Sequence, residues 1–167
     1  EKALLDVGAL LQRALQVEVL RMGSQNITVP TKIDPGLPRI WGNGNQLLQC
    51  FLQIISNAKD ALVEVGGGTF AVSARQEGDE LVLEFVDTGP GLREPQRVFD
   101  PFYTTKPVGR GTGLGLSATY GVVQDHGGRI ACENRPEGGA AFVIRLPIAN
   151  REAGSEAELA KAQVSLR

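Results

Sequence analysis

The sequence contains little of what several functional classes require. Its 167 residues include 2 cysteines, 1 histidine and 1 tryptophan, and aromatic residues make up only 5%. Two distant cysteines and a single histidine cannot supply four ligands at any familiar spacing, which argues against a structural zinc site. No apolar run approaches the ~18 residues that a membrane-spanning helix needs. The net charge of −2 disfavours non-specific binding to nucleic acid or to an anionic membrane.

The cysteines and the first residues of the chain favour a cytoplasmic location. Cys50 and Cys132 both lie in apolar stretches, as expected of buried free thiols in a reducing compartment. The N-terminal residues do not resemble a signal peptide. Because the chain begins with Glu1 rather than methionine, we expect it to be a piece of a longer protein, whose other parts could anchor it to a membrane.

Hydrophobic patterning predicts one domain, in line with the chain length and its 42% of hydrophobic residues. Apolar residues at helical spacing predict helices over residues 4–22, 45–65 and 113–126. Extended apolar patterns predict strands over residues 27–33, 69–75, 81–87, 129–133 and 140–146. This order indicates an α+β fold in which helices cover one face of a sheet. Residues 151–167, rich in Ala and Glu, are expected to form an exposed tail or linker.

Glycine is concentrated in one part of the chain. Of the 21 glycines, 15 fall between Gly66 and Gly139. Such a local excess indicates a region where the backbone must approach a ligand closely or adopt unusual conformations. Residues 88–112 lack any sustained apolar period, and a loop of that length inside a domain is typical of a lid or a binding loop.

One face of the second expected helix carries polar residues. Gln53, Asn57 and Asp60 are spaced i, i+4 and i+7, so they share a face. The side-chain oxygen of Asn57 is a suitable ligand for Mg²⁺, which prefers oxygen and keeps part of its hydration shell. The same pattern fits the solvated face of an ordinary amphipathic helix, so this segment alone leaves both interpretations open.

Asp87 follows an apolar strand and precedes Gly89 and Gly91. A carboxylate at a strand end is able to accept a hydrogen bond from an exocyclic amine such as that of adenine. The two glycines allow the backbone to curve around a flat ring. A tight turn explains the same residues equally well, because Asp and Gly are both common in turns.

Four glycines alternate directly before the third expected helix: Gly109, Gly111, Gly113 and Gly115. Glycines at this place permit close backbone approach, and a helix N-terminus presents unpaired N–H groups that bind anions. Lys106 and Arg110 add positive charge to the same loop. We therefore favour phosphate binding over a flexible hinge. The chain has no Gly-Lys pair and no G-x-G-x-x-G motif, which excludes a Walker A loop and a Rossmann fingerprint.

Taken together and in this order, these segments resemble the catalytic and ATP-binding domain of bacterial sensor histidine kinases, in the GHKL superfamily. The matches are the N box at Asn57, the G1 box at Asp87 to Gly91, the F box at Phe99 to Phe102 and the G2 box at Gly109 to Gly115. The residues around Asn57 and the run Phe102-Tyr103-Thr104-Thr105-Lys106 are similar to the nitrogen-regulator-like branch. The resemblance covers residues 4–148.

The resemblance implies a two-layer α/β sandwich of the GHKL ATPase type, with a mixed sheet, helices on one face and a long ATP lid. It assigns residues 1–150 to a catalytic domain and residues 151–167 to a tail or linker. The implied cofactors are ATP and Mg²⁺, with Asn57 as the metal ligand. The residues implied in catalysis are Asn57, Gln53 and Lys106. The residues implied in nucleotide binding are Asp87, Gly89, Gly91, Lys59, Asp60, Phe102, Thr105, Arg110, Gly111, Thr112, Gly113, Leu114, Gly115 and Leu116.

The implied reaction moves the γ-phosphate of ATP to a histidine on an upstream dimerisation helix that this chain lacks. A response-regulator receiver domain would take the phosphate next. Such transfer needs mainly positioning and charge neutralisation, which amides, a metal ion and two cations supply. His126 lies outside the acceptor motif, and we expect it to be a helix C-terminal residue favoured by the helix dipole. Without the dimerisation helices, this piece is expected to be monomeric.

Two residues depart from the family pattern. Gln53 stands where many of these kinases have Asn and other GHKL members have Glu. Because Gln is a poor base, a gyrase-like cycle of ATP hydrolysis is disfavoured. Ala140 stands where the family often has Thr after a glycine, so a hydroxyl near the adenine is missing.

Two alternatives remain open from the sequence. One is another GHKL enzyme, such as an anti-sigma-factor serine kinase or a MutL-type ATPase, and the F box and the G2 box argue against it. The other is a degenerate nucleotide-sensing module without transfer activity. Asn57, Asp87 and the G2 glycines argue against that module, whereas Gln53 leaves room for it.

Overall fold

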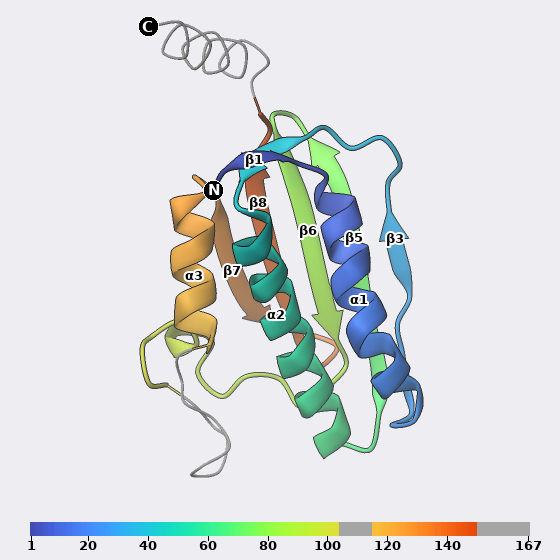
Figure 1. The fold of residues 1–167 in the computed structure, drawn as a ribbon. Coiled ribbons are helices and arrows are strands. Elements are labelled where there is room, and N and C mark those ends of the chain that lie inside the picture. The colour runs from blue at the N-terminus through green and yellow to red at the C-terminus, as the bar shows by residue number, and fades with distance from the viewer. Residues whose placement is uncertain (104–114, 150–167) are drawn as a thin grey trace, which may run out of the picture.

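Helices pack side by side against one face of a mixed β-sheet in the computed structural model, which describes residues 1–103 and 115–149 (Figure 1). The described helices are α1 (Val7–Gly23), α2 (Gly44–Glu64) and α3 (Gly115–Asp125), with a short 3-10 helix, η1, at Pro95–Arg97. The neighbours along this layer are α1 with α2 and α2 with α3. The α+β prediction of a two-layer sandwich, with helices on one face of a mixed sheet, is confirmed.

The main sheet has the order β2-β5-β6-β8-β7, and β3 also pairs with β5. Its strands are β2 (Ile27–Thr28), β3 (Thr31–Ile33), β5 (Gly68–Glu77), β6 (Glu80–Asp87), β7 (Arg129–Asn134) and β8 (Ala140–Pro147). Strands β2 and β3 run parallel to β5, whereas the other neighbours are antiparallel. Val86 pairs with Ala141, and Ala140 pairs with Asn134, so the ends of β6 and β7 meet the start of β8.

The apolar face of α2 forms the centre of the core. Its N-cap Asn43 accepts a hydrogen bond of 3.0 Å from the Gln46 N–H, which satisfies a free donor of the first turn. Fully buried side chains recur along this face at helical spacing: Leu47, Phe51, Ile55 and Leu62. The ring of Phe51 lies 6.2 Å from that of Phe85 on β6. This packing fixes the helix on the sheet, and it thereby fixes the polar residues that the same helix carries.

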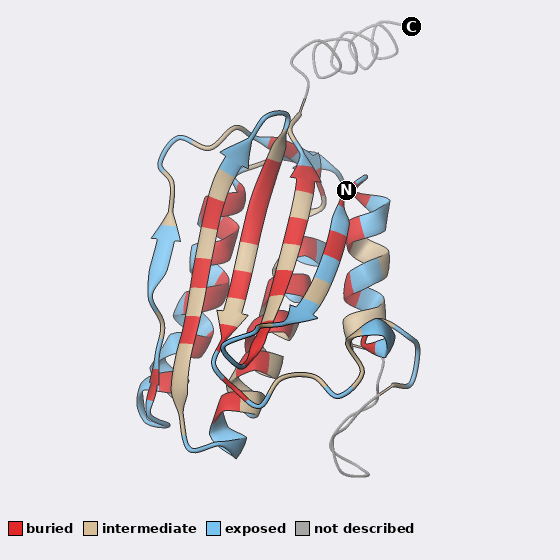
Figure 2. Cartoon of the chain, turned by 180° about the vertical axis from the view of Figure 1, so that it is seen from behind, coloured by how far each residue is buried: buried red, intermediate tan, exposed pale blue. Residues whose placement is uncertain are grey.

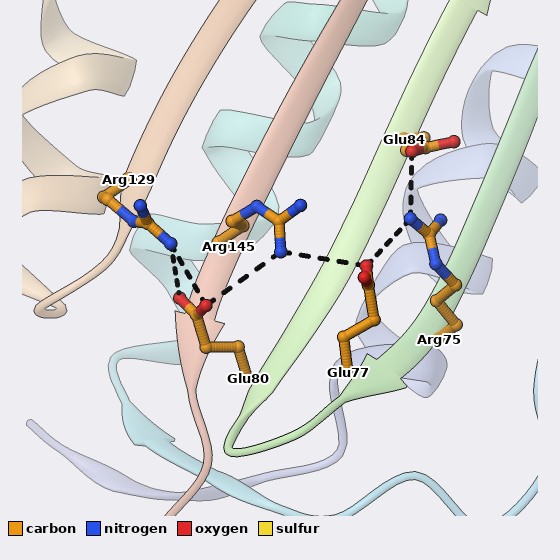
Figure 3. A network of polar contacts seen from close by, with 6 residues as sticks. All are labelled: Arg75, Glu77, Glu80, Glu84, Arg129 and Arg145. Atoms are coloured by element: carbon orange, nitrogen blue, oxygen red, sulfur yellow. Dashed lines mark hydrogen bonds and ion pairs between the residues drawn. The ribbon is translucent and has the colours of Figure 1, made fainter.

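The other face of the sheet is open, and residues of different burial alternate along its strands (Figure 2). Charged side chains on this face form a network of ion pairs: Arg75, Glu77, Glu80, Glu84, Arg129 and Arg145 (Figure 3). Val82 faces the same side but is 0% exposed, because Arg75 and Arg145 flank it in register. Exposed ion pairs contribute little stability individually. Their arginine side chains instead cover an outward apolar residue while the charged ends stay in water.

The structure differs from the sequence prediction at both ends of the N-terminal region. Leu4 and Leu5, expected in the first helix, belong to β1 (Ala3–Leu5), which pairs antiparallel with β4 (Ile40–Gly42), a strand that was not predicted. Helix α1 begins only after Asp6, whose side chain accepts a bond of 3.1 Å from the Ala9 N–H. Pro30 separates the expected strand 27–33 into β2 and β3, since proline has no N–H to donate to a strand ladder. Within the described ranges, no helix is both long and apolar enough to cross a membrane.

Candidate active site

Helix α2 brings three of the sequence-predicted segments together. The side chain of Gln53 donates from Nε2 to Oδ1 of Asn57 at 3.1 Å. The first residue of α3 lies against the same amide, because a Cβ placed on Gly115 would be 2.5 Å from Cδ of Gln53. One turn beyond Asn57, Ala61 lies 3.4 Å from the position of a Cβ on Gly89. The amide pair, the start of α3 and the loop after β6 therefore meet along one helix.

Asp87 is the last residue of β6 and is only 6% exposed. Its Oδ1 accepts hydrogen bonds of 2.9 Å from the Gly89 N–H and 3.3 Å from the Ala140 N–H. Burial raises the pKa of the Asp87 carboxyl above its ordinary value, while the two N–H groups and the charge of Arg135 oppose this rise. Both bonds use the same oxygen, so the plane of the carboxylate is held by its own loop and by β8.

The turn between β7 and β8 packs on the backbone of Asp87. Arg135 donates from Nη1 to the carbonyl of Asp87 at 3.5 Å and to the carbonyl of Gly138 at 3.4 Å. Gly139 has a φ of +86°, and a Cβ there would collide with the Asp87 carbonyl. Only glycine combines that conformation with such close approach. Ala140 is buried and contributes its N–H to the carboxylate.

The two phenylalanines of the F box have different surroundings. The ring of Phe99 lies 5.4 Å from Tyr120 on α3 and 6.2 Å from Phe142 on β8. Phe102 is 75% exposed and has a φ of +67°, a left-handed conformation that is rare for a bulky residue. Phe99 thus joins the body of the domain, whereas Phe102 is directed away from it. A nucleotide contact of Phe102 stays a prediction.

The side chain of Lys59, on α2, forms an ion pair with a residue of α1. Its Nζ lies 3.3 Å from Oε2 of Glu18 on α1, and the two side chains are 16% and 11% exposed. This ion pair directs the Lys59 side chain towards α1. The predicted contact of Lys59 with a nucleotide stays a prediction. Asp60 is exposed, and Leu116 packs its side chain against the core near the start of α3.

Several predicted site residues lie outside the described residues: Thr105, Lys106, Arg110, Gly111, Thr112, Gly113 and Leu114. Their assignment to the phosphates stays a prediction.

A groove of about 390 Å³ runs between α2 and α3. Residues of both helices line it: Asn45, Gln46, Gln49, Cys50, Gln53, Gly115, Ala118, Thr119 and Val122. Both cysteines are free, and burial raises the pKa of the Cys50 and Cys132 thiols to about 11. Neither thiol is therefore an activated nucleophile at neutral pH.

Sequence reasoning missed two residues that hold the site in place. Asn134, at the end of β7, bonds both backbone groups of Leu92, at 2.7 and 2.8 Å. His126 accepts from the Asn43 N–H at 2.9 Å, so it connects α3 to α2 instead of serving only as a charge at a helix end. A single Asn at a strand end and a single His before glycines carry no distinctive sequence signal, because their partners are far away along the chain.

The fold and this arrangement define an ATPase domain of the GHKL type. The profile of the family described as "Histidine kinase-, DNA gyrase B-, and HSP90-like ATPase" matches residues 42–150. The chain belongs to this family and is therefore a nucleotide-using domain. Within the family, the chain is similar to parts of sensor histidine kinases.

Two curated relatives illustrate this similarity. Sporulation kinase E of Bacillus subtilis is 34% identical over 125 residues, which are 74% of this chain and 16% of that protein. The sensory histidine kinase/phosphatase NtrB of Azospirillum brasilense is 36% identical over 140 residues, which are 75% of this chain and 34% of that protein. The chain thus spans only a minor part of the relatives that it matches.

Solved structures agree on the fold. The catalytic domain of histidine kinase ThkA superposes with a TM-score of 0.79 at 24% identity, covering 90% of this chain and 99% of that one. The mycobacterial sensor histidine kinase MprB superposes with a TM-score of 0.74 at 26% identity, covering 89% of this chain and 97% of that one.

Proposed function

We propose that this domain binds ATP with Mg²⁺ and transfers the γ-phosphate to a histidine on a dimerisation helix of the same kinase, outside this chain. A response-regulator receiver domain is the subsequent acceptor. The proposal rests on one observation. Helix α2 carries the Gln53–Asn57 pair and contacts both Gly115 and the Asp87–Gly89 loop.

The adenine end of the site fits Asp87. Its Oδ1 is held by the N–H groups of Gly89 and Ala140, which leaves Oδ2 to accept from the exocyclic amine of adenine. A buried acceptor of this kind discriminates strongly, because a ligand without the matching donor leaves it unpaired. Gly89 and Gly91 are proposed to let the backbone of the loop curve around the flat ring.

The phosphate end fits Asn57. Its side-chain oxygen, which accepts a bond from Gln53, is the type of ligand that Mg²⁺ prefers. Among the described residues, no cluster of three or more His, Cys, Asp or Glu could hold a metal ion. When bound, Mg²⁺ would neutralise phosphate charge. Lys106, Arg110 and the backbone of residues 111–115 are proposed to hold the phosphates.

A related structure supports nucleotide binding. Full-length ShkA was solved in complex with AMPPNP, and it superposes with a TM-score of 0.77 at 25% identity, covering 90% of this chain and 32% of that one. We further propose that residues 1–150 are the catalytic domain and residues 151–167 a tail or linker. Because ATP is an intracellular substrate, we propose a cytoplasmic location, whether or not the parent protein is anchored in a membrane.

Calorimetry with a non-hydrolysable ATP analogue tests the first half of the proposal. We expect binding that Mg²⁺ strengthens, and we expect Asn57→Ala to remove that strengthening. Asn45→Ala is the matched control, since Asn45 is another asparagine of α2 and lines the groove near its start. Absence of binding at millimolar analogue would contradict the proposal.

Phosphotransfer tests the second half. The domain is mixed with γ-labelled ATP and the separately produced dimerisation domain of its parent kinase. We expect label on that domain that is labile in acid and stable in alkali, as phosphohistidine is. Acid-stable label would indicate a serine kinase instead. Nucleotide binding without any transfer would favour a nucleotide-sensing module.

A further inference from the structure

The loop after β6, residues 88–94, is tied to the sheet at Leu92. The N–H of Leu92 donates to Oδ1 of Asn134 at 2.7 Å, and Nδ2 of Asn134 donates to the Leu92 carbonyl at 2.8 Å. One side-chain amide thus satisfies both backbone groups of one residue, as a neighbouring strand does in a ladder. This places Leu92, which packs against the core, beside the end of β7.

Asn134 occupies the point where this loop meets the β7–β8 turn. It ends β7 and pairs with Ala140 across the two strands. The N–H of Ala140 bonds to the carboxylate of Asp87, and the neighbouring Arg135 bonds to the Asp87 carbonyl. Hydrogen bonds therefore connect the loop, the β7–β8 turn and Asp87, and Asn134 makes those to Leu92.

The backbone of the loop lies very close to the side-chain amide of Asn134. A Cβ placed on Gly91 would lie 3.0 Å from Oδ1 of Asn134, and Gly91 has a φ of +83°. Asn is suited to the position because it offers an acceptor and a donor on one plane. Asp would keep the acceptor but would place a second oxygen against the Leu92 carbonyl.

We propose that Asn134 is a positioning residue for nucleotide binding: it holds the Gly89–Leu92 loop against the Asp87 carboxylate, so that the adenine end of the site is formed before the nucleotide arrives. The inference rests on the proposed function, because it assigns the adenine to that loop. Its ligand is the adenine nucleoside portion, not the phosphates.

The test compares Asn134→Ala and the nearly isosteric Asn134→Asp with the wild type. Glu133→Ala is the matched control, since Glu133 is an exposed neighbour on the same strand. Affinities for ADP and for a non-hydrolysable ATP analogue are measured by calorimetry, and exchange of the Leu92 amide hydrogen by NMR. We expect Asn134→Ala, which loses both hydrogen bonds to Leu92, to bind both nucleotides about tenfold more weakly. Asn134→Asp keeps the acceptor for the Leu92 N–H but sets an oxygen against the Leu92 carbonyl, and it should also bind both nucleotides more weakly. The Leu92 amide should exchange faster in Asn134→Ala, and the control should match the wild type.

Three results would overturn the inference. The first is wild-type affinity in a folded Asn134→Asp variant. The second is a loss confined to the ATP analogue, which would place the effect at the γ-phosphate. The third is unchanged exchange of the Leu92 amide in Asn134→Ala, a measurement that needs no nucleotide. A wild-type domain that binds neither nucleotide would contradict the proposed function itself and the inference with it, whereas a failure of the variants alone would contradict only the inference.

Discussion

The backbone N–H of Asn43 donates a hydrogen bond of 2.9 Å to Nε2 of His126. Because an N–H cannot accept, Nε2 carries no proton, and Nδ1 is the donor to the Val122 carbonyl at 2.7 Å. Gly42 packs on the same ring, where a Cβ would lie 2.5 Å from Cδ2. The neutral imidazole therefore joins the start of α2 to the end of α3, and the other end of α3 meets Gln53 in the site.

We expect His126→Ala to lower the free energy of unfolding by about 2 kcal/mol, because it leaves the partly buried Asn43 N–H without its partner and opens a cavity where the buried imidazole lay. Urea unfolding of the two proteins measures this. His126→Gln is the control, since its side-chain oxygen is able to accept from the same N–H and should restore part of the loss. Equal stability of His126→Ala and wild type would contradict the role. The variant should still transfer phosphate, because His126 is not the proposed acceptor.

Gly115→Ala probes the contact between α3 and Gln53. The added Cβ would lie 2.5–2.7 Å from the end of the Gln53 side chain, which is flexible enough to move aside. We expect a stability cost below about 1 kcal/mol, but a displaced Gln53 loses its bond to Asn57. The Mg²⁺-dependent affinity for an ATP analogue should therefore fall. Gly121→Ala, on the same helix with no atom within 4 Å of the new Cβ, is the control and should keep that affinity.

Sequence patterns predicted the elements of the core well but not the contacts that assemble the site. The spacing of Leu47, Phe51 and Ile55 identifies α2, since that periodicity is local. The short strands β1 and β4 have too few residues to show a periodic pattern. Leu4 and Leu5 fit the helical spacing of the residues after them, but Asp6 caps α1, so both lie before the helix. A local sequence pattern does not show which distant strand a short strand pairs with.

The same limit applies to the site. The order of Asn57, Asp87 and Gly115 predicted a nucleotide site, and the structure places all of them around α2. Lys59 lies next to the Asn57 motif in sequence, yet a helix turns by about 100° per residue, so residues two apart do not share a face. Its pairing with Glu18 depends on the packing of α1 on α2, which no local spacing reveals.

Asp87→Asn separates adenine recognition from stability. The Asn side chain keeps an oxygen for the Gly89 and Ala140 N–H groups and removes a charge that burial disfavours. We expect stability equal to or above that of the wild type, because the buried charge at this position is removed. Affinity for ATP should fall at least about tenfold, because a neutral amide replaces a charged acceptor for the adenine amine. Near-wild-type affinity with an unchanged fold would contradict the role of Asp87.

The raised pKa of Asp87 also predicts how binding depends on pH. Burial is the main cause, so as the pH falls the folded protein takes up this proton before the unfolded chain does. In that window protonation at Asp87 favours the folded state, whereas nucleotide affinity falls because the carboxylate is lost. Binding of adenosine nucleotides should thus begin to weaken at a pH above the ordinary Asp value of 3.8. Titration of Asp87→Asn at the same pH values should lack this step, and a step of equal size there would assign it to another group.

The ion pair between Glu18 and Lys59 predicts a coupling between α1 and α2. Both side chains are largely buried, so removal of one leaves the other charge without compensation. We expect Glu18→Gln and Lys59→Met each to lower the free energy of unfolding by about 2 kcal/mol, and the double variant to lose less than the sum. The affinity of Lys59→Met for an ATP analogue tests separately the predicted contact of Lys59 with the nucleotide. A larger loss for ATP than for adenosine would assign Lys59 to the phosphates and would require its side chain to leave Glu18 when the nucleotide binds, whereas unchanged affinity would contradict that contact.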